Sequence, residues 1–574
     1  MNSNNLRVLL IFVVASVILV VAVSFNARGY QDSWILDDVT VVTIVFILAF
    51  SVFASVCDDN RLLAIGCASF IVLLNAIPNL KYELFTNPFD SMAHYGYIRN
   101  LMFLGHIPNN GIVAATYQDF PGMHIFTGSL SIISGLSISA TIKLVTSTIA
   151  GIIPLMTYVA TKRVFEPSIQ RFIIVGSGLP TSVSYVLTGT SFAVPFYFSI
   201  ICLILVSLVA ENKRQHTLVL LIFVFGLLFS HAITTLFVIL FLGIVALLLK
   251  LLAIKENWFS KSYTHVLTAA LVILTVSFAA RLTFGNGTVL DIFSRATESF
   301  LTGPKSGIVP ATFFAVPFSA KVVFFALTYA MDAVITLLSC AGVIVLFLKL
   351  RREYREAYKR FYAFLLCLMS AILGLLTLQF LSGFSSIEYE RLIAYAIVLS
   401  PFLIGLFLWN IHGYFSRHRI GSAVVVLLLF SCISVSMIQL FPYQPIAPTA
   451  NVLSTNLPTN EYVYDFRTVN TVYQESMILF AQSFSTKTTT VASDTVTRWQ
   501  IYGFANDAFI NRTLYYSPLN NQNLDWNLFL LHYDGKAGSL NEVVENRTSG
   551  ILTGLKNNLG NVVYDNGESF IIAR

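Results

Sequence analysis

Charged side chains are scarce in this sequence: Asp, Glu, Lys and Arg make up 11% of the 574 residues, while 56% are hydrophobic. A typical soluble domain is about 25% charged, so this shortage excludes a soluble globular enzyme. Apolar runs long enough to cross about 30 Å of hydrocarbon recur along the chain, and the mean hydropathy is +0.75. The composition therefore predicts a polytopic membrane protein.

Several kinds of site are missing as well. The six cysteines lie in or at the ends of apolar runs and none lies in the polar C-terminal part, so no disulfide framework is implied. The CxxC and HExxH spacings that are typical of zinc sites are absent. The formal net charge of +6 comes from Lys and Arg in short loops, without basic patches interleaved with aromatic residues. A nucleic-acid partner is therefore not expected.

The apolar runs predict about 13 transmembrane helices. They are expected at residues 8–24, 39–56, 62–77, 139–160, 172–187, 192–210, 218–230, 234–252, 266–280, 322–348, 364–381, 392–411 and 423–440. The first run is interpreted as an uncleaved anchor because no convincing small-residue cleavage site follows it. Residues 1–61 then form an N-terminal transmembrane hairpin, and residues 62–440 form the main transmembrane domain, with an outer loop at 80–137.

Lys and Arg are concentrated in alternate loops. One set of loops includes Lys162, Arg163 and the basic run 349–360, and the opposite set holds fewer than half as many basic residues. Because basic loops favour the cytoplasmic side, we expect a cytoplasmic N-terminus in the cell membrane, with the outer loop and the C-terminal tail outside. The Asn-x-Thr sequons all fall outside in this arrangement, at Asn286, Asn511 and Asn546.

The composition changes at residue 441, where a proline-containing linker begins. Strands are expected at 488–492, 528–531 and 561–572, and helices at 471–484 and 495–502. About 120 residues of this kind are just enough for a separate core. The predicted fold class is an all-α polytopic membrane protein with a small extracytoplasmic α/β domain at 441–574.

One polar stretch, residues 87–124, lies between predicted spans and has an unusual content of titratable side chains. It contains three of the nine histidines and two aspartates: His94, His106, His124, Asp90 and Asp119. Residues 90–104 are expected to form an amphipathic interfacial helix that stops at Gly105. The apolar run 121–135 is too short to span comfortably and is expected to be re-entrant or interfacial.

The candidate catalytic pair in this stretch is Asp90 and His94. Asp90 is the candidate general base, and His94, one helical turn later on the same face, would orient or tune it. The structural alternative is that Asp90 only caps the helix. Arg99, Asp119 and His124 are candidate substrate-binding residues, although Asp119 before Phe-Pro equally fits a turn-forming role.

Two cations are expected at the outer membrane surface. Lys143 lies one turn inside its predicted span, and Arg391 opens another span at the same level, preceded by Glu388 and Tyr389. Charged groups at this depth are costly unless paired or wetted, and a lipid phosphate would lie at the same level. The alternatives are snorkelling of Lys143 and an ion pair between Arg391 and Glu388. His231, at an outer helix end, is a further candidate that equally fits a packing role.

These short motifs together resemble the GT-C superfamily of membrane glycosyltransferases. The matching motifs are Asp90-x-x-x-His94, Asp119-Phe-Pro-Gly-x-His124, Lys143-Leu-Val-Thr-Ser and the run from Arg391 to Pro401. The similarity covers roughly residues 62–411 and is to protein mannosyltransferases and lipid A aminoarabinose transferases. It implies that 62–440 is a GT-C-like catalytic domain and that Asp90 is its catalytic base. The Trp-Trp-Asp motif of oligosaccharyltransferases is absent, which argues against transfer of a whole oligosaccharide to asparagine.

The expected reaction is inverting transfer of a sugar from a polyprenyl (dolichyl) phosphate to an acceptor hydroxyl. The expected partners are the lipid-linked sugar, membrane lipid, and an acceptor that is a glycan, protein or lipid. Lys143, Arg391 and Arg99 would offset the charge of the leaving phosphate. The chemistry requires no cofactor; a divalent cation near Asp90, Asp119 and the histidines is compatible with the spacing but is not demanded by it.

Two other functions stay open at this point. A transporter or flippase for lipid-linked glycans would need paired ionisable residues at mid-membrane and an internal repeat. Asp332 is the only deep ionisable residue found, and no repeat is visible. A glycan polymerase or ligase that uses a lipid-linked oligosaccharide would differ from the first hypothesis only in its donor.

Overall fold

The structure is a computed structural model of the chain. It describes residues 3–26, 38–81, 90–107, 117, 119–179, 189–209, 213–255, 262–284, 318–353, 355–382, 392, 394–415, 478–483, 491–493, 513–515, 528–532, 561–565 and 569–573. Within these residues, six helices are long and apolar enough to cross a membrane. The chain is therefore a multi-pass membrane protein, as its composition predicts.

Helices account for most of the described residues. Their bounds are α1 Ser3–Asn26, α2 Asp38–Val56, α3 Asn60–Lys81, α4 Asp90–Leu104, α6 Gly122–Ser134, α7 Ile138–Thr148, α8 Ile152–Lys162, α9 Pro167–Ser177, α10 Gly189–Val209, α11 Lys213–Ser230, α12 Ala232–Lys255, α13 Ser262–Phe284, α16 Phe318–Arg352, α17 Glu356–Ser382 and α19 Ser400–Phe415. A short 3-10 turn, Ile149–Gly151, joins α7 to α8. Helical residues occur at each predicted span up to 392–411, and the run at 423–440 lies outside the described residues.

One predicted span is placed differently. The run at 172–187 was expected to begin at residue 172, but α9 begins at Pro167 and ends at Ser177. The helix starts earlier because Glu166 is extended and Pro167 occupies the first turn, where its missing N–H leaves no backbone bond unmade. Residues 180–188 lie outside the described part of the chain.

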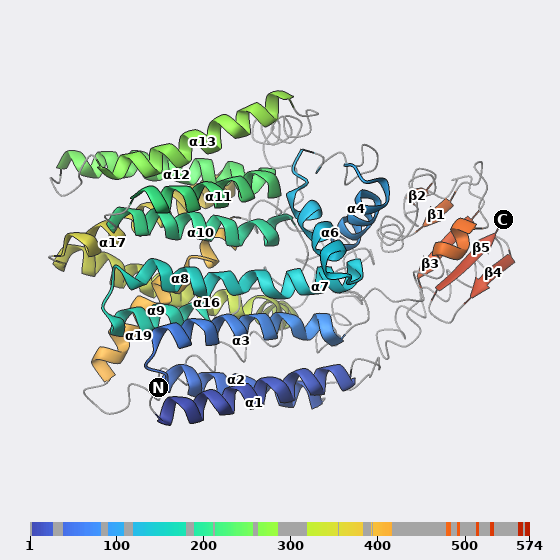
Figure 1. The fold of residues 1–574 in the computed structure, drawn as a ribbon, viewed down its shortest axis with the longest axis horizontal. Helices are drawn as coiled ribbons and strands as arrows, with labels where there is room; N and C mark the ends of the chain where they lie inside the picture. Colours follow the sequence, from blue (N-terminus) through green and yellow to red (C-terminus); the bar gives the residue numbers. More distant parts are fainter. Residues whose placement is uncertain are drawn as a thin grey trace.

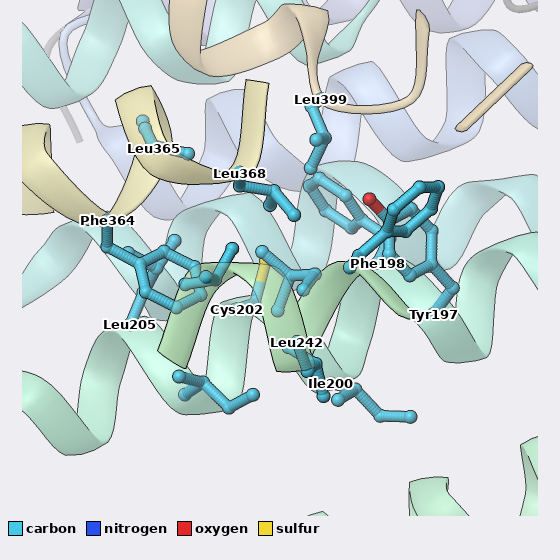
Figure 2. Close-up of a cluster of buried hydrophobic side chains, with 14 of the residues drawn as sticks. Tyr197, Phe198, Ile200, Cys202, Leu205, Leu242, Phe364, Leu365, Leu368 and Leu399 are labelled. Carbon is cyan, nitrogen blue, oxygen red and sulfur yellow. The ribbon is translucent and has the colours of Figure 1, made fainter. Parts of the chain in front are cut away.

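Helix α10 is central to the larger hydrophobic core. Its sequence is apolar on all sides, and 89% of the span Gly189–Ser207 is buried, as expected for a helix surrounded by other helices. It packs against α8, α11, α12, α13 and α17. Figure 2 shows Phe198 and Cys202 of α10 beside Leu242 of α12 and Leu368 of α17.

Helices α1, α2 and α3 form a second apolar cluster, which extends to α9 and α19. Stacked phenylalanine rings join them: the ring centroids of Phe50 and Phe70 lie 3.7 Å apart, and those of Phe12 and Phe53 lie 5.1 Å apart. Helices α9 and α19 meet backbone to backbone, because a β-carbon on Gly405 would lie 2.3 Å from Cα of Ile173, and one on Gly176 would lie 2.8 Å from the carbonyl of Pro401. Small residues permit such close helix packing in membranes.

The C-terminal part contains a five-stranded mixed sheet in the order β2-β1-β3-β5-β4. Its strands are β1 Val491–Ser493, β2 Thr513–Tyr515, β3 Leu528–His532, β4 Asn561–Asp565 and β5 Ser569–Ala573. Strand β1 pairs in parallel with β2 and β3, whereas β5 pairs antiparallel with β3 and β4. Residues 478–483 are helical, within the predicted helix 471–484.

The strand predicted at 561–572 is wrong as a single element. Two strands, β4 and β5, occupy this stretch and pair antiparallel, so the chain reverses between them. The intervening sequence contains Asn566-Gly567, which is a strong hairpin signal between apolar runs. The short strand β2 was not predicted.

The polar stretch lies at one end of the helical bundle. Figure 1 shows α4 and α6 beside each other at the end that faces the sheet, whereas the N-terminus lies at the opposite end. Helix α4 packs against α6 and α7, and α6 also packs against α11. The described part of this stretch is therefore held against the ends of the apolar helices.

Candidate active site

Helices α4 and α6 begin and end where the sequence predicts. Helix α4 starts at Asp90 and ends before Gly105, whose φ of 70° is the left-handed conformation that favours glycine at a helix end. Helix α6 follows Pro121 and is closed by Gly135 with φ 67°. These signals fix the positions at which the two helices present their side chains to each other.

His94 of α4 and His124 of α6 form a buried hydrogen-bonded pair. Nδ1 of His94 lies 2.9 Å from Nε2 of His124, so one of these nitrogens carries the hydrogen and donates it to the other. Burial lowers the pKa of His94 from 6.5 to about 3. Burial, and then the charge of His94, lower the pKa of His124. Both imidazoles are therefore uncharged at neutral pH. They form a hydrogen bond with each other but supply no positive charge to the site.

Tyr117 joins this pair to a third histidine. Its ring centroid lies 4.9 Å from that of His94, 5.2 Å from that of His124 and 6.3 Å from that of His231. The three histidines come from α4, from α6 and from the residue between α11 and α12, so distant parts of the chain meet at one tyrosine. Tyr117 was not predicted as a site residue, although it lies within the polar stretch.

His231 has a defined set of partners on its other side. The backbone N–H of Thr234 donates to its Nδ1 at 3.2 Å, and Oγ1 of Thr234 lies 2.7 Å from the same nitrogen. Oγ1 of Thr234 is also 2.7 Å from the hydroxyl of Tyr395. The packing role considered for His231 is thus present, together with its contact to Tyr117.

A cation that the sequence did not single out lies beside this cluster. Arg281, in the last turn of α13, donates from Nη1 to the backbone carbonyl of Asp119. Its guanidinium carbon lies 4.1 Å from the ring centroid of Phe229 and 5.7 Å from that of Phe120. Because the acceptor is a main-chain carbonyl, residue identity alone gave no signal for this contact.

Tyr97 of α4 packs against His124, with ring centroids 4.3 Å apart. Within the described part of the chain, the Tyr97 hydroxyl and Nδ1 of His124 are buried without a hydrogen-bond partner. Burial, and secondly the negative charge of Asp119, raise the pKa of Tyr97 to about 12. The tyrosine therefore stays protonated and keeps one hydrogen available for donation.

The predicted site residues divide into three groups. His94, His124, His231 and the main chain of Asp119 are brought together around Tyr117 and Arg281. Arg99 and Lys143 are half-buried, on α4 and α7, respectively, and both have interactions of their own. Asp90 is the first residue of α4, one turn before His94, but its side chain lies outside the described residues, as do Glu388, Tyr389 and Arg391.

A metal site is not evident in the part of the chain that the structure describes. No group of three or more His, Cys, Asp or Glu side chains there is arranged to hold an ion. His94 and His124 supply two ring nitrogens that already bond to each other. A divalent cation therefore stays a prediction from the sequence.

Neither a protein-family model nor a curated protein matches the sequence. Among solved structures, the chain is similar to the archaeal oligosaccharyltransferase AglB from Archaeoglobus fulgidus, in complex with an inhibitory peptide and a dolichol-phosphate, with 11% identity and a TM-score of 0.48 over 82% of this chain and 69% of that chain. It is also similar to ArnT from Cupriavidus metallidurans bound to undecaprenyl phosphate, with 10% identity and a TM-score of 0.43 over 90% of this chain and 97% of that chain. No residue role is transferred from similarities this weak. The resemblance to the GT-C superfamily rests on the sequence motifs.

Proposed function

We propose that this chain is a membrane glycosyltransferase that moves a sugar from a polyprenyl phosphate donor to an acceptor hydroxyl at the outer face of the membrane. The observation that carries the proposal is the contact of Tyr117 with His94, His124 and His231, at the end of an otherwise apolar bundle. Buried polar groups are costly in such a protein and mark functional sites. The donor class is taken from the sequence resemblance.

The acceptor side of the reaction is assigned to Asp90 and His94. Asp90, at the start of α4, takes the proton of the acceptor hydroxyl as its oxygen forms a bond to the sugar carbon. His94 lies one turn later and is buried as a neutral imidazole, so it orients groups by hydrogen bonding without competing for that proton. Attack and departure occur on opposite faces of the sugar, which gives inversion.

The donor side is assigned to cations near the cluster. Negative charge grows on the phosphate oxygen as the bond from the sugar carbon to that oxygen breaks, and fixed positive groups stabilise it. Arg281 is suited to this role because it lies beside Asp119 and Phe229, and Phe229 is two residues before His231. Lys143 and Arg391 remain the cations proposed from the sequence, and Asp119, Arg99, Glu388 and Tyr389 remain proposed contacts to donor or acceptor.

The arrangement of the chain in the membrane is part of the proposal. A cytoplasmic N-terminus, a catalytic domain at 62–440 and an outer α/β domain at 441–574 would place the site and the sheet on the same side. The sheet then lies where it can meet an acceptor glycan, protein or lipid. A flippase and a polymerase or ligase are the competing functions, and neither is favoured by a specific contact in the described residues.

The decisive experiment is mass spectrometry of lipid-linked sugars and surface glycans in a deletion strain complemented with variants. Loss of the chain should cause one lipid-linked sugar to accumulate and its product to disappear. Asp90→Asn should behave like the deletion, whereas Asp59→Asn should restore the product. Asp59 is a matched control because it caps α3 by accepting from the backbone N–H of Arg61, on an exposed loop. Restored product with Asp90→Asn would remove the proposed base.

A further inference from the structure

The hydrogen bonds of His231 fix where its proton lies. His231 immediately precedes α12 and caps it, because the N–H of Thr234, the third residue of that helix, donates to Nδ1 at 3.2 Å. Helix caps are usually Ser, Thr, Asp or Asn, whose oxygens accept without any change of protonation. An imidazole can accept at Nδ1 only if that nitrogen carries no proton, so the ring proton lies on Nε2.

The unprotonated Nδ1 of His231 also determines which of the neighbouring hydroxyls donate and which accept. Nδ1 of His231 is an acceptor, so the hydroxyl of Thr234, 2.7 Å away, donates to it. That hydroxyl has a single hydrogen, so its oxygen accepts from the hydroxyl of Tyr395, also at 2.7 Å. The chain therefore runs in one direction, from Tyr395 through Thr234 to His231.

Burial makes this chain rigid. Thr234 and Tyr395 are 0% exposed and His231 is 5% exposed. The ring of Tyr395 is packed by three aromatic rings, with centroid distances of 5.5 Å to Tyr197, 5.7 Å to Phe237 and 5.9 Å to Phe241. A chain of buried hydroxyls whose members are held by packing keeps the direction of its hydrogen bonds. Reversing that direction would put a proton on Nδ1 of His231, which would then face the donating N–H of Thr234.

The opposite edge of the imidazole faces the candidate active site. A β-carbon on Gly189, the first residue of α10, would lie 2.5 Å from Cδ2 of His231 and 2.9 Å from the hydroxyl of Tyr117. Cδ2 is bonded to Nε2, so the edge of the ring that carries the proton lies beside Gly189, which also lies beside the Tyr117 hydroxyl. The two ring nitrogens therefore have different neighbours. Nδ1 accepts from α12, and the protonated Nε2 lies on the side of the cluster around Tyr117.

Resting on the proposed function, we infer that Thr234 and Tyr395 are positioning residues that hold His231 as a neutral Nε2–H donor directed at the Tyr117 side of the site. They touch neither donor nor acceptor and act through His231. The chemical class that such a donor fits is an oxygen that gains negative charge, such as the phosphate oxygen of the leaving lipid. The residue's role depends on its tautomer, and the tautomer depends on Thr234 and Tyr395.

The proton position can be measured without any activity. The full-length protein, labelled with ¹⁵N-histidine and placed in lipid bilayers, would be studied by solid-state NMR, with the His231 signals assigned from a His231→Gln sample. The expected spectrum has a protonated Nε2 and an unprotonated Nδ1. Thr234→Val and Tyr395→Phe should shift the Nδ1 signal, and Thr234→Ser should restore it. A protonated Nδ1 in the wild-type protein, or unchanged signals in both Thr234→Val and Tyr395→Phe, would overturn the inference.

Matched controls separate positioning from packing. Tyr197→Phe removes a hydroxyl from a neighbouring buried tyrosine that has no hydrogen-bond partner in the described residues, and should leave the His231 signals unchanged. Thr235→Val alters the adjacent buried threonine, whose hydroxyl donates to the carbonyl of His231 and not to its ring. If either control shifts Nδ1 as much as Tyr395→Phe does, the assigned relay is wrong.

Activity provides a second, separable readout. Where transfer is measurable, Thr234→Val and Tyr395→Phe should lower kcat by about tenfold, the scale of one buried hydrogen bond, with Thr234→Ser close to wild type. Absence of any transfer in the wild type would count against the proposed function and leave the NMR test of the tautomer in force. A normal kcat in variants whose Nδ1 signal has shifted would show that the tautomer has no role in the reaction.

Discussion

His94 and His124 face each other across the contact between α4 and α6, with Nδ1 of the first 2.9 Å from Nε2 of the second. Both rings are buried, and both are held neutral by that burial. The bond joins two helices, α4 and α6, that follow α3 in the chain and lie at one end of the bundle. Protonation of either ring would place a positive charge in a buried position, which burial disfavours.

The first prediction is that stability falls as the pH falls. In the unfolded chain these histidines bind a proton below about pH 6.5, whereas folded His94 does so only near pH 3. The unfolded state therefore binds more protons across this window, and the free energy of unfolding should fall with a slope that approaches about 1.4 kcal/mol per pH unit for each buried histidine below about pH 5.5. Thermal unfolding of the purified protein between pH 7 and pH 5 measures this slope.

His106 provides the control for that slope. It lies just beyond α4 and its side chain is exposed, so His106→Gln removes a histidine without disturbing a buried one. His94→Gln should reduce the slope of the free energy of unfolding against pH by the contribution of one histidine, whatever the absolute stability of the variant. An equal slope in wild type and His94→Gln would show that His94 does not titrate in this way.

Replacement of Arg281 should weaken binding of the lipid donor, although Arg281 was not among the predicted site residues. Arg281→Gln keeps hydrogen-bond donors near the carbonyl of Asp119 but removes the charge. A hydrogen bond to a charged group is worth about 1.5–3 kcal/mol, so the KM for the lipid donor should rise about 10- to 100-fold. Steady-state kinetics with varied donor measures this.

A second arginine serves as the comparison for Arg281. Arg351, in the last turn of α16, also lies over a phenylalanine, with its guanidinium carbon 4.5 Å from the Phe347 ring centroid, but it is exposed. Arg351→Gln should leave the donor KM unchanged. Equal effects of Arg281→Gln and Arg351→Gln would indicate a general charge effect and not a site contact.

Gly189→Ala is expected to damage the site directly. The added methyl would lie 2.5 Å from Cδ2 of His231, whose ring is held on its other edge by Thr234 and cannot move aside freely. Forced overpacking of this kind costs about 1–3 kcal/mol, and transfer should fall at least tenfold. Gly243→Ala, on α12, adds the same methyl where nothing lies within 4 Å, and should keep full activity and slightly raise the unfolding temperature. Full activity in both variants would contradict the close approach of His231 to α10.

Gly405→Ala is expected to destabilise the bundle without touching the site. Its methyl would meet Cα of Ile173 at 2.3 Å, and backbone atoms yield less readily than side-chain ends. We expect a loss of about 3 kcal/mol or more in the free energy of unfolding, read as a lower melting temperature in detergent. Gly413→Ala, on the same helix, meets nothing within 4 Å and should not lower the melting temperature. A melting temperature unchanged by Gly405→Ala would mean that α9 and α19 are not so close.

Local signals made helices α4 and α6 predictable. An aspartate at the start and a glycine at the end set the bounds of α4 at Asp90 and Leu104, and Pro121 with Gly135 set those of α6. Such signals act within one turn of chain, so a single sequence contains them. The hairpin of β4 and β5 has an equally local signal, the dipeptide Asn566-Gly567. This signal predicts two strands joined by a turn, and not the single strand that the apolar pattern suggested.

The contacts of the site were only partly predictable. The histidines were found because titratable side chains are rare in this chain, so their clustering between spans was informative. The partners that organise them were not: Arg281 bonds to a main-chain carbonyl, and Thr234 and Tyr395 are residue types that are common in apolar helices. Their importance arises from tertiary packing, which leaves no periodicity or spacing in the sequence.

Helix α9 leaves the ribosome long before α19 is made. The surface of α9 around Gly176 must therefore contact lipid or another helix after insertion, until α19 packs against it through Gly405. The contact between α9 and α19 can form only after residue 405 has been synthesised, so nascent chains that stop short of α19 should be substrates for membrane quality control.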